Sequence, residues 1–162
     1  PLGNSFPLPE HDTVPILIAG GIGLGPILFL YSALRLQGCT PLLIVGFRTK
    51  SAIPFAICNS PDTVFCTDDG TMGFHGTAGE YLKTVSLPAK TVLYACGPEG
   101  LLRSVAGFAE RTHIPCWISM EQVMACGLGA CMGCVIRVRQ GNGFARVCTE
   151  GPVFPGEEIV WT

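Results

Sequence analysis

The sequence predicts an α/β fold, in which a doubly wound parallel sheet of about five strands is followed by a small C-terminal β appendage. Two observations predict the sheet: short apolar runs recur along residues 14–119, and helix-like stretches lie between them. Strands that alternate with helices form parallel sheets with both faces covered. After residue 120 the pattern changes to a glycine- and cysteine-rich loop and short apolar segments, which predicts the appendage.

The elements of the sheet follow in order along the chain. Strands are expected at residues 16–19, 42–47, 64–67, 91–95 and 116–119, and helices at residues 27–37, 51–58, 78–84 and 99–111. The last helix has the clearest pattern, because Leu102, Val105 and Ala109 recur on one face. Pro26 fits the first position of the first helix, where its missing N–H is not needed.

Three parts of the chain are expected. Residues 1–13 are polar and proline-rich and read as a linker, residues 14–120 form the sheet domain, and residues 121–162 form the appendage. In the appendage, strands are expected at residues 135–138, 144–147 and 158–161. Asn142 and Gly143 indicate a hairpin turn between the first two of these strands.

Composition narrows the function classes. Lys and Arg number 10 against 12 Asp and Glu, and no basic run occurs, so nucleic-acid binding has no electrostatic support. Residues 14–34 carry no charge and are long enough to span a bilayer. Glycines and Pro26 interrupt their middle, which favours a strand, a tight turn and a helix. No membrane span is expected, and nine cysteines point to metal or thiol chemistry in a reducing cytoplasm.

Four cysteines have the spacing of a metal site. Cys126, Cys131, Cys134 and Cys148 follow the pattern C-x4-C-x2-C-x13-C. The first three have the spacing of plant-type [2Fe–2S] loops, in which four thiolates hold the cluster. The glycines between them let the backbone wrap closely around such a group. The position of the loop after the last strand of the sheet predicts an exposed site that faces a partner.

Other thiol chemistries remain as alternatives. A redox dithiol needs only Cys131 and Cys134, and a structural zinc site normally pairs two C-x2-C knuckles, which Cys148 does not provide. A Rieske centre needs histidine ligands, and no histidine lies in the segment. Four of the remaining cysteines lack companions at ligand spacing and are assigned to packing: Cys39, Cys58, Cys66 and Cys116. Cys96 could be either a buried packing residue or part of a ligand site.

Two turns are candidates for a dinucleotide. The first joins the first strand to the first helix and contains Gly20, Gly21, Gly23 and Gly25. A helix N-terminus with close backbone can bind a pyrophosphate there, although a tight packing turn gives the same pattern. The second is Cys96, Gly97 and Pro98 at the end of the fourth strand, the end at which such sheets bind ligands.

Charged residues after the strands complete this candidate site. Asp68 and Asp69 follow the third strand; their carboxylates can accept hydrogen bonds from ribose hydroxyls and would repel a 2′-phosphate, which favours NAD over NADP. Arg48 could pair with a phosphate or lie in solvent at its strand end. Glu121 could contact a bound cofactor or simply be solvated at the domain junction.

Taken together, these motifs resemble a family. The segments around Gly20, Arg48, Asp68 and Cys96, the loop Met124–Cys131 and the run Val147–Phe154 are similar, in this order, to the electron transfer subunits of NAD-linked dihydroorotate dehydrogenase. These belong to the ferredoxin–NADP reductase superfamily. The resemblance implies that a partner, an FMN-containing catalytic subunit, oxidises dihydroorotate, and that electrons pass through a [2Fe–2S] cluster and FAD to NAD⁺ for pyrimidine biosynthesis. It also implies that Cys96 to Pro98 lie near the nicotinamide.

The sequence departs from the family in one respect. Family members begin with an FAD-binding barrel, and here only the linker that would follow it is seen, so the chain is expected to hold FAD poorly by itself. Two other functions remain as alternatives. One is the small subunit of an NADPH-dependent ferredoxin or sulfide oxidoreductase, in which a carboxylate tends to replace one cluster cysteine. The other is a zinc-binding, nucleotide-sensing module without catalysis.

Overall fold

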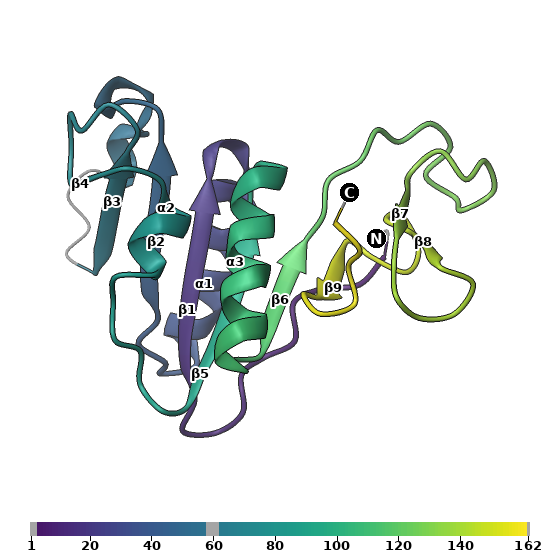
Figure 1. The fold of residues 1–162 in the computed structure, drawn as a ribbon, viewed down its shortest axis with the longest axis horizontal. Helices are drawn as coiled ribbons and strands as arrows, with labels where there is room; N and C mark the ends of the chain where they lie inside the picture. Colours follow the sequence, from purple (N-terminus) through teal and green to yellow (C-terminus); the bar gives the residue numbers. More distant parts are fainter. Residues whose placement is uncertain (1–2, 58–61, 162) are drawn as a thin grey trace.

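The computed structural model describes residues 3–57 and 62–161 and contains one large sheet with helices on both faces, beside a smaller lobe (Figure 1). The strands are β1 (Val14–Gly20), β2 (Leu42–Phe47), β3 (Thr63–Thr67), β4 (Phe74–His75), β5 (Thr91–Cys96), β6 (Cys116–Ser119), β7 (Val135–Arg137), β8 (Phe144–Arg146) and β9 (Val153–Pro155). The α-helices are α1 (Leu24–Leu36), α2 (Ala78–Leu82) and α3 (Glu99–Thr112). The lobe is residues 121–152, and its β7 and β8 form a separate antiparallel pair.

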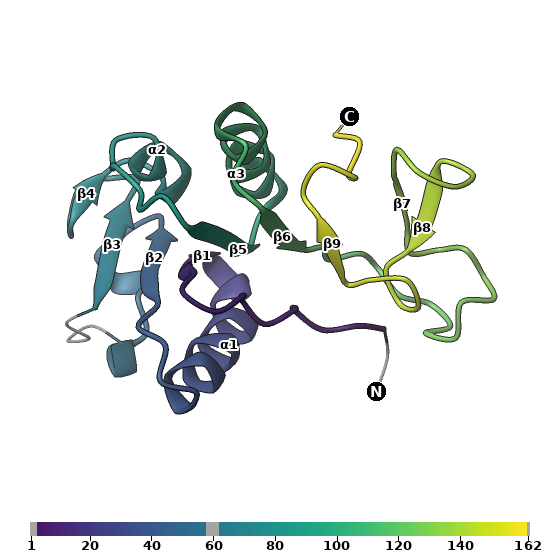
Figure 2. The ribbon, with the colours of Figure 1, turned by 90° about the horizontal axis from the view of Figure 1, so that it is seen from below.

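The large sheet has the strand order β4-β3-β2-β1-β5-β6-β9. All neighbours from β4 to β6 are parallel, and the order reverses on either side of β1, as in a doubly wound fold. Helix α1 lies on one face, whereas α2 and α3 lie on the other (Figure 2). Alternate residues of β1 point into the two cores: Ile16 and Ile18 pack with α2 and α3, and Leu17 packs with α1. The α/β fold class is confirmed.

The sheet has two strands that the sequence did not indicate. β4 has two residues and pairs with β3 at one edge, too short for an apolar pattern to reveal. β9 comes from the predicted appendage and pairs antiparallel with β6, with Ile118 opposite Phe154. The main sheet therefore continues into the C-terminal segment. The expected strand at residues 158–161 is reduced to one bridge, between Val138 and Ile159.

The helix expected at residues 51–58 is wrong in its described part. Two short 3₁₀ turns lie there instead, Lys50–Ala52 and Phe55–Ile57. Pro54 lies between them, and a proline disfavours helical backbone in the residue before it. Cys58 lies outside the described residues. Helix α1 begins at Leu24, so Pro26 occupies its third position, where a missing N–H is still tolerated.

The uncharged segment 14–34 divides into β1, a 3₁₀ turn at Gly21–Gly23 and the start of α1. This arrangement confirms the expected strand, turn and helix. Across residues 3–57 and 62–161, no helix combines the length and the apolar character needed to cross a membrane.

The segment before β1 is fixed at both ends. Phe6 packs edge-on against Tyr94, with ring centroids 5.6 Å apart, and the Tyr94 hydroxyl donates to the Pro7 carbonyl. Asn4 Nδ2 donates to the carbonyls of Glu150 and Val153, and Asn4 Oδ1 accepts from the Val153 N–H at 2.9 Å. This segment therefore ties the lobe to the face of the sheet that carries α1.

Candidate functional site

A largely apolar pocket of about 510 Å³ opens at the carboxyl ends of the central strands. It is lined by Gly20, Gly21, Gly46, Phe47, Arg48, Ala52, Asp68, Thr77, Ala78, Pro98, Gly100, Leu101 and Ser104. Five of the residues proposed from sequence are in this set: Gly20, Gly21, Arg48, Asp68 and Pro98. The volume is that of a small-molecule site, and its place is where doubly wound sheets bind nucleotides.

Not all the glycines of the first turn face this pocket. Gly23 packs against the β5 end, because a Cβ there would lie 2.3 Å from the carbonyl carbon and oxygen of Cys96. Gly20 and Gly97 approach each other in the same way, with a Cβ on Gly97 lying 2.9 Å from the Gly20 nitrogen. Gly21 and Gly25 have open space beside them. In this turn, Gly23 is therefore needed for close packing, whereas Gly21 and Gly25 leave the backbone accessible to a ligand.

The two neighbouring aspartates lie in different surroundings. Asp68 lines the pocket, whereas Asp69 Oδ1 accepts from the Thr71 N–H at 3.0 Å and from the Thr71 hydroxyl at 2.6 Å. These bonds lower the pKa of Asp69 below its usual value. Thr71 Oγ1 also accepts from the Lys50 N–H at 2.8 Å. Asp69 therefore links the loop after β3 to the loop after β2, and Asp68 is the carboxylate available to a ligand.

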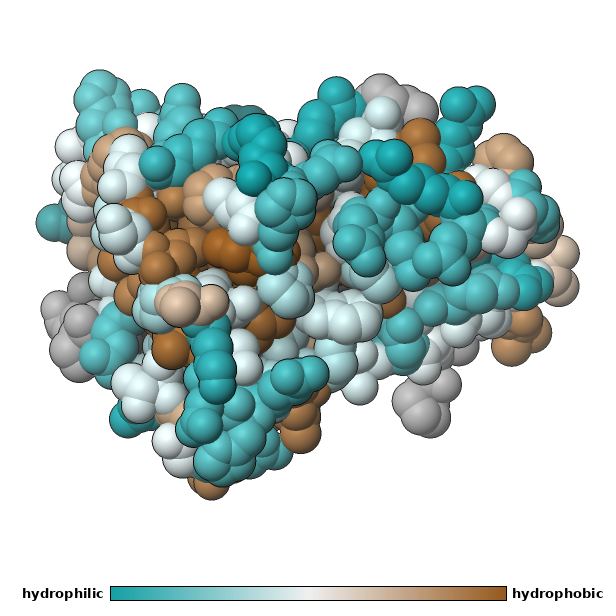
Figure 3. Space-filling model, turned by 60° about the horizontal axis from the view of Figure 1, so that its bottom comes forward, coloured by the Kyte–Doolittle hydropathy of each residue, from teal (hydrophilic) through white to brown (hydrophobic). Residues whose placement is uncertain are grey.

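A second pocket of about 360 Å³ lies between the sheet and the start of the lobe. Its lining includes Gly97 and Pro98, which follow β5, and Glu121 and Val123, which follow β6. Pro98 also borders the larger pocket, so the two are adjacent. The molecule is elongated in the view of Figure 3, where apolar residues gather in a hollow of the sheet-bearing part at left and the lobe at right is mainly polar.

Cys96 ends β5, directly before Gly97 and Pro98, and is buried. Burial raises the pKa of its thiol; a hydrogen bond with Ser119 opposes this rise, and the Glu121 carboxylate adds to it. Cys96 stands opposite Ser119 in the β5–β6 register. Sequence reasoning missed Ser119, although its place at the end of the strand next to Cys96 was a usable signal. Cys66 and Cys116 are buried and Cys39 is half-buried, as packing residues are.

The four predicted ligand cysteines lie in the lobe as two pairs. Cys126 Sγ accepts from the N–H groups of Leu128 and Cys131, both at 3.4 Å, and these bonds lower the pKa of Cys126 to about 6. The Cys131 thiol also interacts with Cys126, and Cys131 Sγ accepts from the Gly133 N–H. Donation from Cys148, first from its backbone and then from its thiol, lowers the pKa of Cys134, and the same thiol contact raises that of Cys148.

The thiols interact in two pairs, Cys126 with Cys131 and Cys134 with Cys148, and this pairing suits a group that contains two metal ions. A zinc ion requires four ligands around one point, whereas each iron of a [2Fe–2S] cluster takes two thiolates. Backbone N–H groups directed at sulfur also suit thiolate ligands, because they stabilise the charged form. The donor set therefore fits a [2Fe–2S] group.

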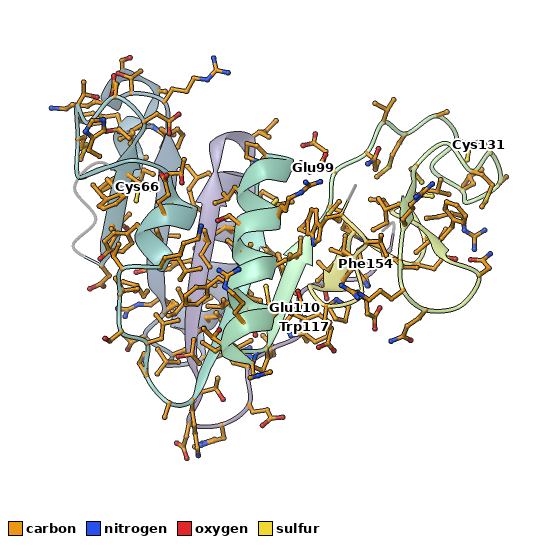
Figure 4. All side chains as sticks on the ribbon, in the orientation of Figure 1. Cys66, Glu99, Glu110, Trp117, Cys131 and Phe154 are labelled. Atoms are coloured by element: carbon orange, nitrogen blue, oxygen red, sulfur yellow. The ribbon has the colours of Figure 1, made fainter. Side chains whose placement is uncertain are left out.

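The first pair lies at the molecular surface. Cys126 and Cys131 are exposed, whereas Cys134 and Cys148 are buried. Figure 4 shows Cys131 at the far end of the molecule from Cys66, with Phe154 between the sheet and the lobe. Large apolar side chains of the same loop are also exposed: Val123 at 86%, Leu128 at 80%, Met132 at 49% and Met124 at 46%.

Comparison with known proteins identifies relatives for the whole chain. Residues 121–160 match the family described as the iron-sulfur cluster binding domain of dihydroorotate dehydrogenase B. The dihydroorotate dehydrogenase B (NAD(+)) electron transfer subunits of Desulforamulus reducens and Geobacillus kaustophilus are 34% and 38% identical over 99% of this chain. The chain spans 64% and 63% of their lengths, which is just under two thirds.

A solved structure gives the same fold. The NADH-dependent reduced ferredoxin-NADP oxidoreductase, studied for flavin-based electron bifurcation, superposes with a TM-score of 0.82 at 26% identity, over 99% of this chain and 58% of that one. The sequence relatives, the matched domain and the similar solved structure thus all point to proteins of electron transfer. The chain is therefore similar over 99% of its length to the dihydroorotate dehydrogenase B electron transfer subunits, and its residues 121–160 match their iron–sulfur cluster binding domain.

Proposed function

We propose that this chain is the nucleotide- and cluster-holding part of an electron transfer subunit in pyrimidine biosynthesis. In this function, electrons from a dihydroorotate-oxidising flavoprotein pass through a [2Fe–2S] cluster and FAD to NAD⁺. One observation carries the proposal: the two pockets share Pro98, and the second reaches Val123, three residues before the thiol Cys126. The nucleotide site and the thiol site therefore adjoin through one short segment.

At the nucleotide pocket, the chain supplies binding and selection. Gly20, Gly21 and Gly25 present close backbone to a pyrophosphate, and Gly23 holds their turn against β5. Arg48 pairs with a phosphate or ribose. Asp68 accepts from ribose hydroxyls and disfavours a 2′-phosphate, while Asp69 orders the loop beside it.

At the second pocket, the chain shapes the place where a nicotinamide and a flavin would meet. Gly97, Pro98 and Glu121 line this pocket, and the buried Cys96 directly precedes Gly97. The bound cofactors supply the one- and two-electron chemistry, whereas the protein orients them and excludes water. Cys126, Cys131, Cys134 and Cys148 hold the cluster as two pairs of thiolates.

The work is divided along the chain. Residues 1–13 connect, residues 14–120 bind the nucleotide, and residues 121–162 hold the cluster. The partner is an FMN-containing dihydroorotate dehydrogenase catalytic subunit, which docks on the exposed apolar residues of the thiol loop. A location in the cytoplasm accords with the eight described cysteines, all of which are free thiols.

The test is co-expression of the intact protein with a candidate catalytic flavoprotein under anaerobic conditions. We expect a stable complex in which dihydroorotate bleaches the visible absorption of the cluster, and in which NAD⁺ restores it. A protein that holds iron and sulfide but is reduced only by nucleotide, and never by dihydroorotate through any such partner, would contradict the proposed donor.

A second candidate function is the small subunit of an NADPH-dependent ferredoxin or sulfide oxidoreductase, favoured by the likeness to the ferredoxin-NADP oxidoreductase. Titration with NADH and NADPH separates the two functions, because only this alternative expects tighter binding of NADPH.

A third candidate function is a zinc-binding, nucleotide-sensing module. Metal analysis decides it, since that protein would be colourless and contain zinc without iron or sulfide.

A further inference from the structure

We propose that Arg146 is a positioning residue for the thiol site, which clamps the loop of Cys126 and Cys131 to the turn of Cys148 and raises the reduction potential of the cluster held there. The inference rests on the proposed cluster and concerns a residue that is not a ligand. Arg146 ends strand β8, two residues before Cys148.

The guanidinium of Arg146 joins two segments that are distant in sequence. Its Nη1 donates to the carbonyl of Gly129, in the middle of the Cys126–Cys131 loop, at 2.9 Å. Its Nε donates to both carboxylate oxygens of Glu150 at 3.0 Å, and Nη2 donates to the same carboxylate. Such forked contacts between arginine and a carboxylate are directional and stronger than neutral hydrogen bonds.

The backbone of Arg146 closes the turn around Cys148. Its carbonyl accepts from the N–H groups of Thr149, Glu150 and Gly151 at 3.2, 2.9 and 3.1 Å, and its own N–H donates to Glu150 Oε2 at 2.8 Å. The Thr149 hydroxyl donates to the same carboxylate. Glu150 is therefore the centre of a polar network that surrounds one ligand cysteine.

The loop packs directly on this network. A Cβ on Gly129 would lie 2.8 Å from Thr149 Cγ2 and 3.4 Å from Arg146 Nη1, at a φ of +79° that side chains rarely adopt. The side chains of Arg146 and Glu150 are 35% and 42% exposed, and they form an ion pair across one helical-type spacing of four residues.

Besides holding the two segments together, Arg146 brings a positive charge to the thiol site. Arg146 lies two residues from Cys148 along the chain, and its Nη1 contacts the Cys126–Cys131 loop at Gly129, so the guanidinium lies beside both parts of the thiol site. Reduction adds a negative charge to a cluster, and nearby charge and hydrogen bonds set cluster potentials. A fixed cation here favours the reduced form, while the anion of Glu150 offsets part of that effect.

Three variants of the intact, anaerobically purified protein separate the effect of the hydrogen bonds of Arg146 from the effect of its charge. Arg146→Gln loses the forked hydrogen bonds and the positive charge, so we expect a lower midpoint potential and faster iron loss to a chelator. Arg146→Lys keeps the cation without the fork, so we expect a potential near that of the wild type with faster iron loss. Glu150→Gln removes the opposing anion, so we expect a higher potential. Arg139→Gln is the control, because Arg139 pairs with Glu110 of α3 at 3.7 Å.

The measurements are a redox titration followed by electron paramagnetic resonance, the iron-to-protein ratio and the rate of iron release. Unchanged potential and release in Arg146→Gln overturn the inference. If that variant binds no iron, the potentials of Arg146→Lys and Glu150→Gln decide: equal potentials in these two overturn the role of charge. A wild-type protein without iron or sulfide would instead overturn the proposed function itself.

Discussion

The sheet and the lobe are stabilised by different forces. In the sheet, every residue of β5 is buried, and α1 and α3 each bury one face against it. In the lobe, the two paired strands have three residues each, and the loop from Glu121 to Gly133 is exposed except for Gly127 and Gly129. Hydrophobic burial therefore stabilises the sheet. Polar contacts and the expected metal must do more of this work in the lobe.

This difference between the sheet and the lobe explains how the geometry of the nucleotide pocket and that of the thiol site are each determined. The nucleotide pocket is formed by strand ends that the core already fixes, so few side chains need to be specified. The thiol site depends on particular hydrogen bonds within irregular backbone. Changes in the two regions should accordingly have separable effects, and four predictions test this separation.

The largest effect is expected from Cys134→Ser. Loss of one thiolate leaves one iron with a single protein thiolate, so the iron-to-protein ratio should fall nearly to zero. NADH affinity, measured by calorimetry, should be unchanged because the nucleotide pocket lies on the sheet. Cys39→Ser, outside the lobe, is the control and should retain its iron. Normal iron in Cys134→Ser would refute the ligand assignment.

The converse test is Gly23→Ala. The added Cβ meets the Cys96 carbonyl at 2.3 Å, and overpacking of this kind costs about 1–3 kcal/mol. The free energy of unfolding should fall by this amount. Because the displaced turn carries Gly20 and Gly21 of the pocket, NADH affinity should also fall by about tenfold, or ~1.4 kcal/mol of binding free energy. The iron content should stay normal. Gly107→Ala in α3, where the added Cβ meets only the end of the Arg111 side chain at 3.4 Å, should bind NADH as the wild type does; equal losses in both variants would contradict the packing role.

Asn4→Ala tests whether the two regions are tied together. It removes three side-chain hydrogen bonds to residues 150–153, and each contributes about 0.5–1.5 kcal/mol. Hydrogen exchange in this turn should accelerate, whereas exchange in β1 and β5 should not change. The exposed neighbour Ser5→Ala serves as the control. Unaltered protection of residues 150–153 would show that the contact contributes nothing to holding the lobe.

The smallest effect should distinguish the adjacent aspartates. Asp68→Ala removes the carboxylate in the pocket, so NADPH should gain about tenfold relative to NADH, or ~1.4 kcal/mol. Asp69→Ala breaks the bonds to Thr71 and should weaken both nucleotides alike. Binding titrations with the two nucleotides measure both effects. A change of preference in Asp69→Ala alone would reverse these roles.

Much of the fold was predictable because the central strands are continuous apolar runs. β4 and β9 were not. β4 has only two residues, and β9 pairs with a strand more than thirty residues earlier, without the hairpin turn that indicated β7 and β8. The helix expected at residues 51–58 was wrong, because the prediction followed the spacing of apolar residues and gave too little weight to Pro54. In the site, glycine and cysteine spacings indicated the backbone turns and thiols. Ser119, Arg146 and Asn4 were not indicated, because their roles arise from long-range contacts.

The pairing of β6 with β9 has a kinetic consequence. The lobe leaves the sheet after Ser119 and returns at Val153, and these two residues are partners in the same ladder. The Met120 N–H donates to the Pro152 carbonyl at 2.8 Å directly beyond them. Electron tunnelling slows exponentially as the gap between donor and acceptor widens. In the proposed electron transfer, paired strands rather than a flexible linker would hold the cluster at a constant distance from its redox partner. The rigidity of this sheet edge would then help to set the rate.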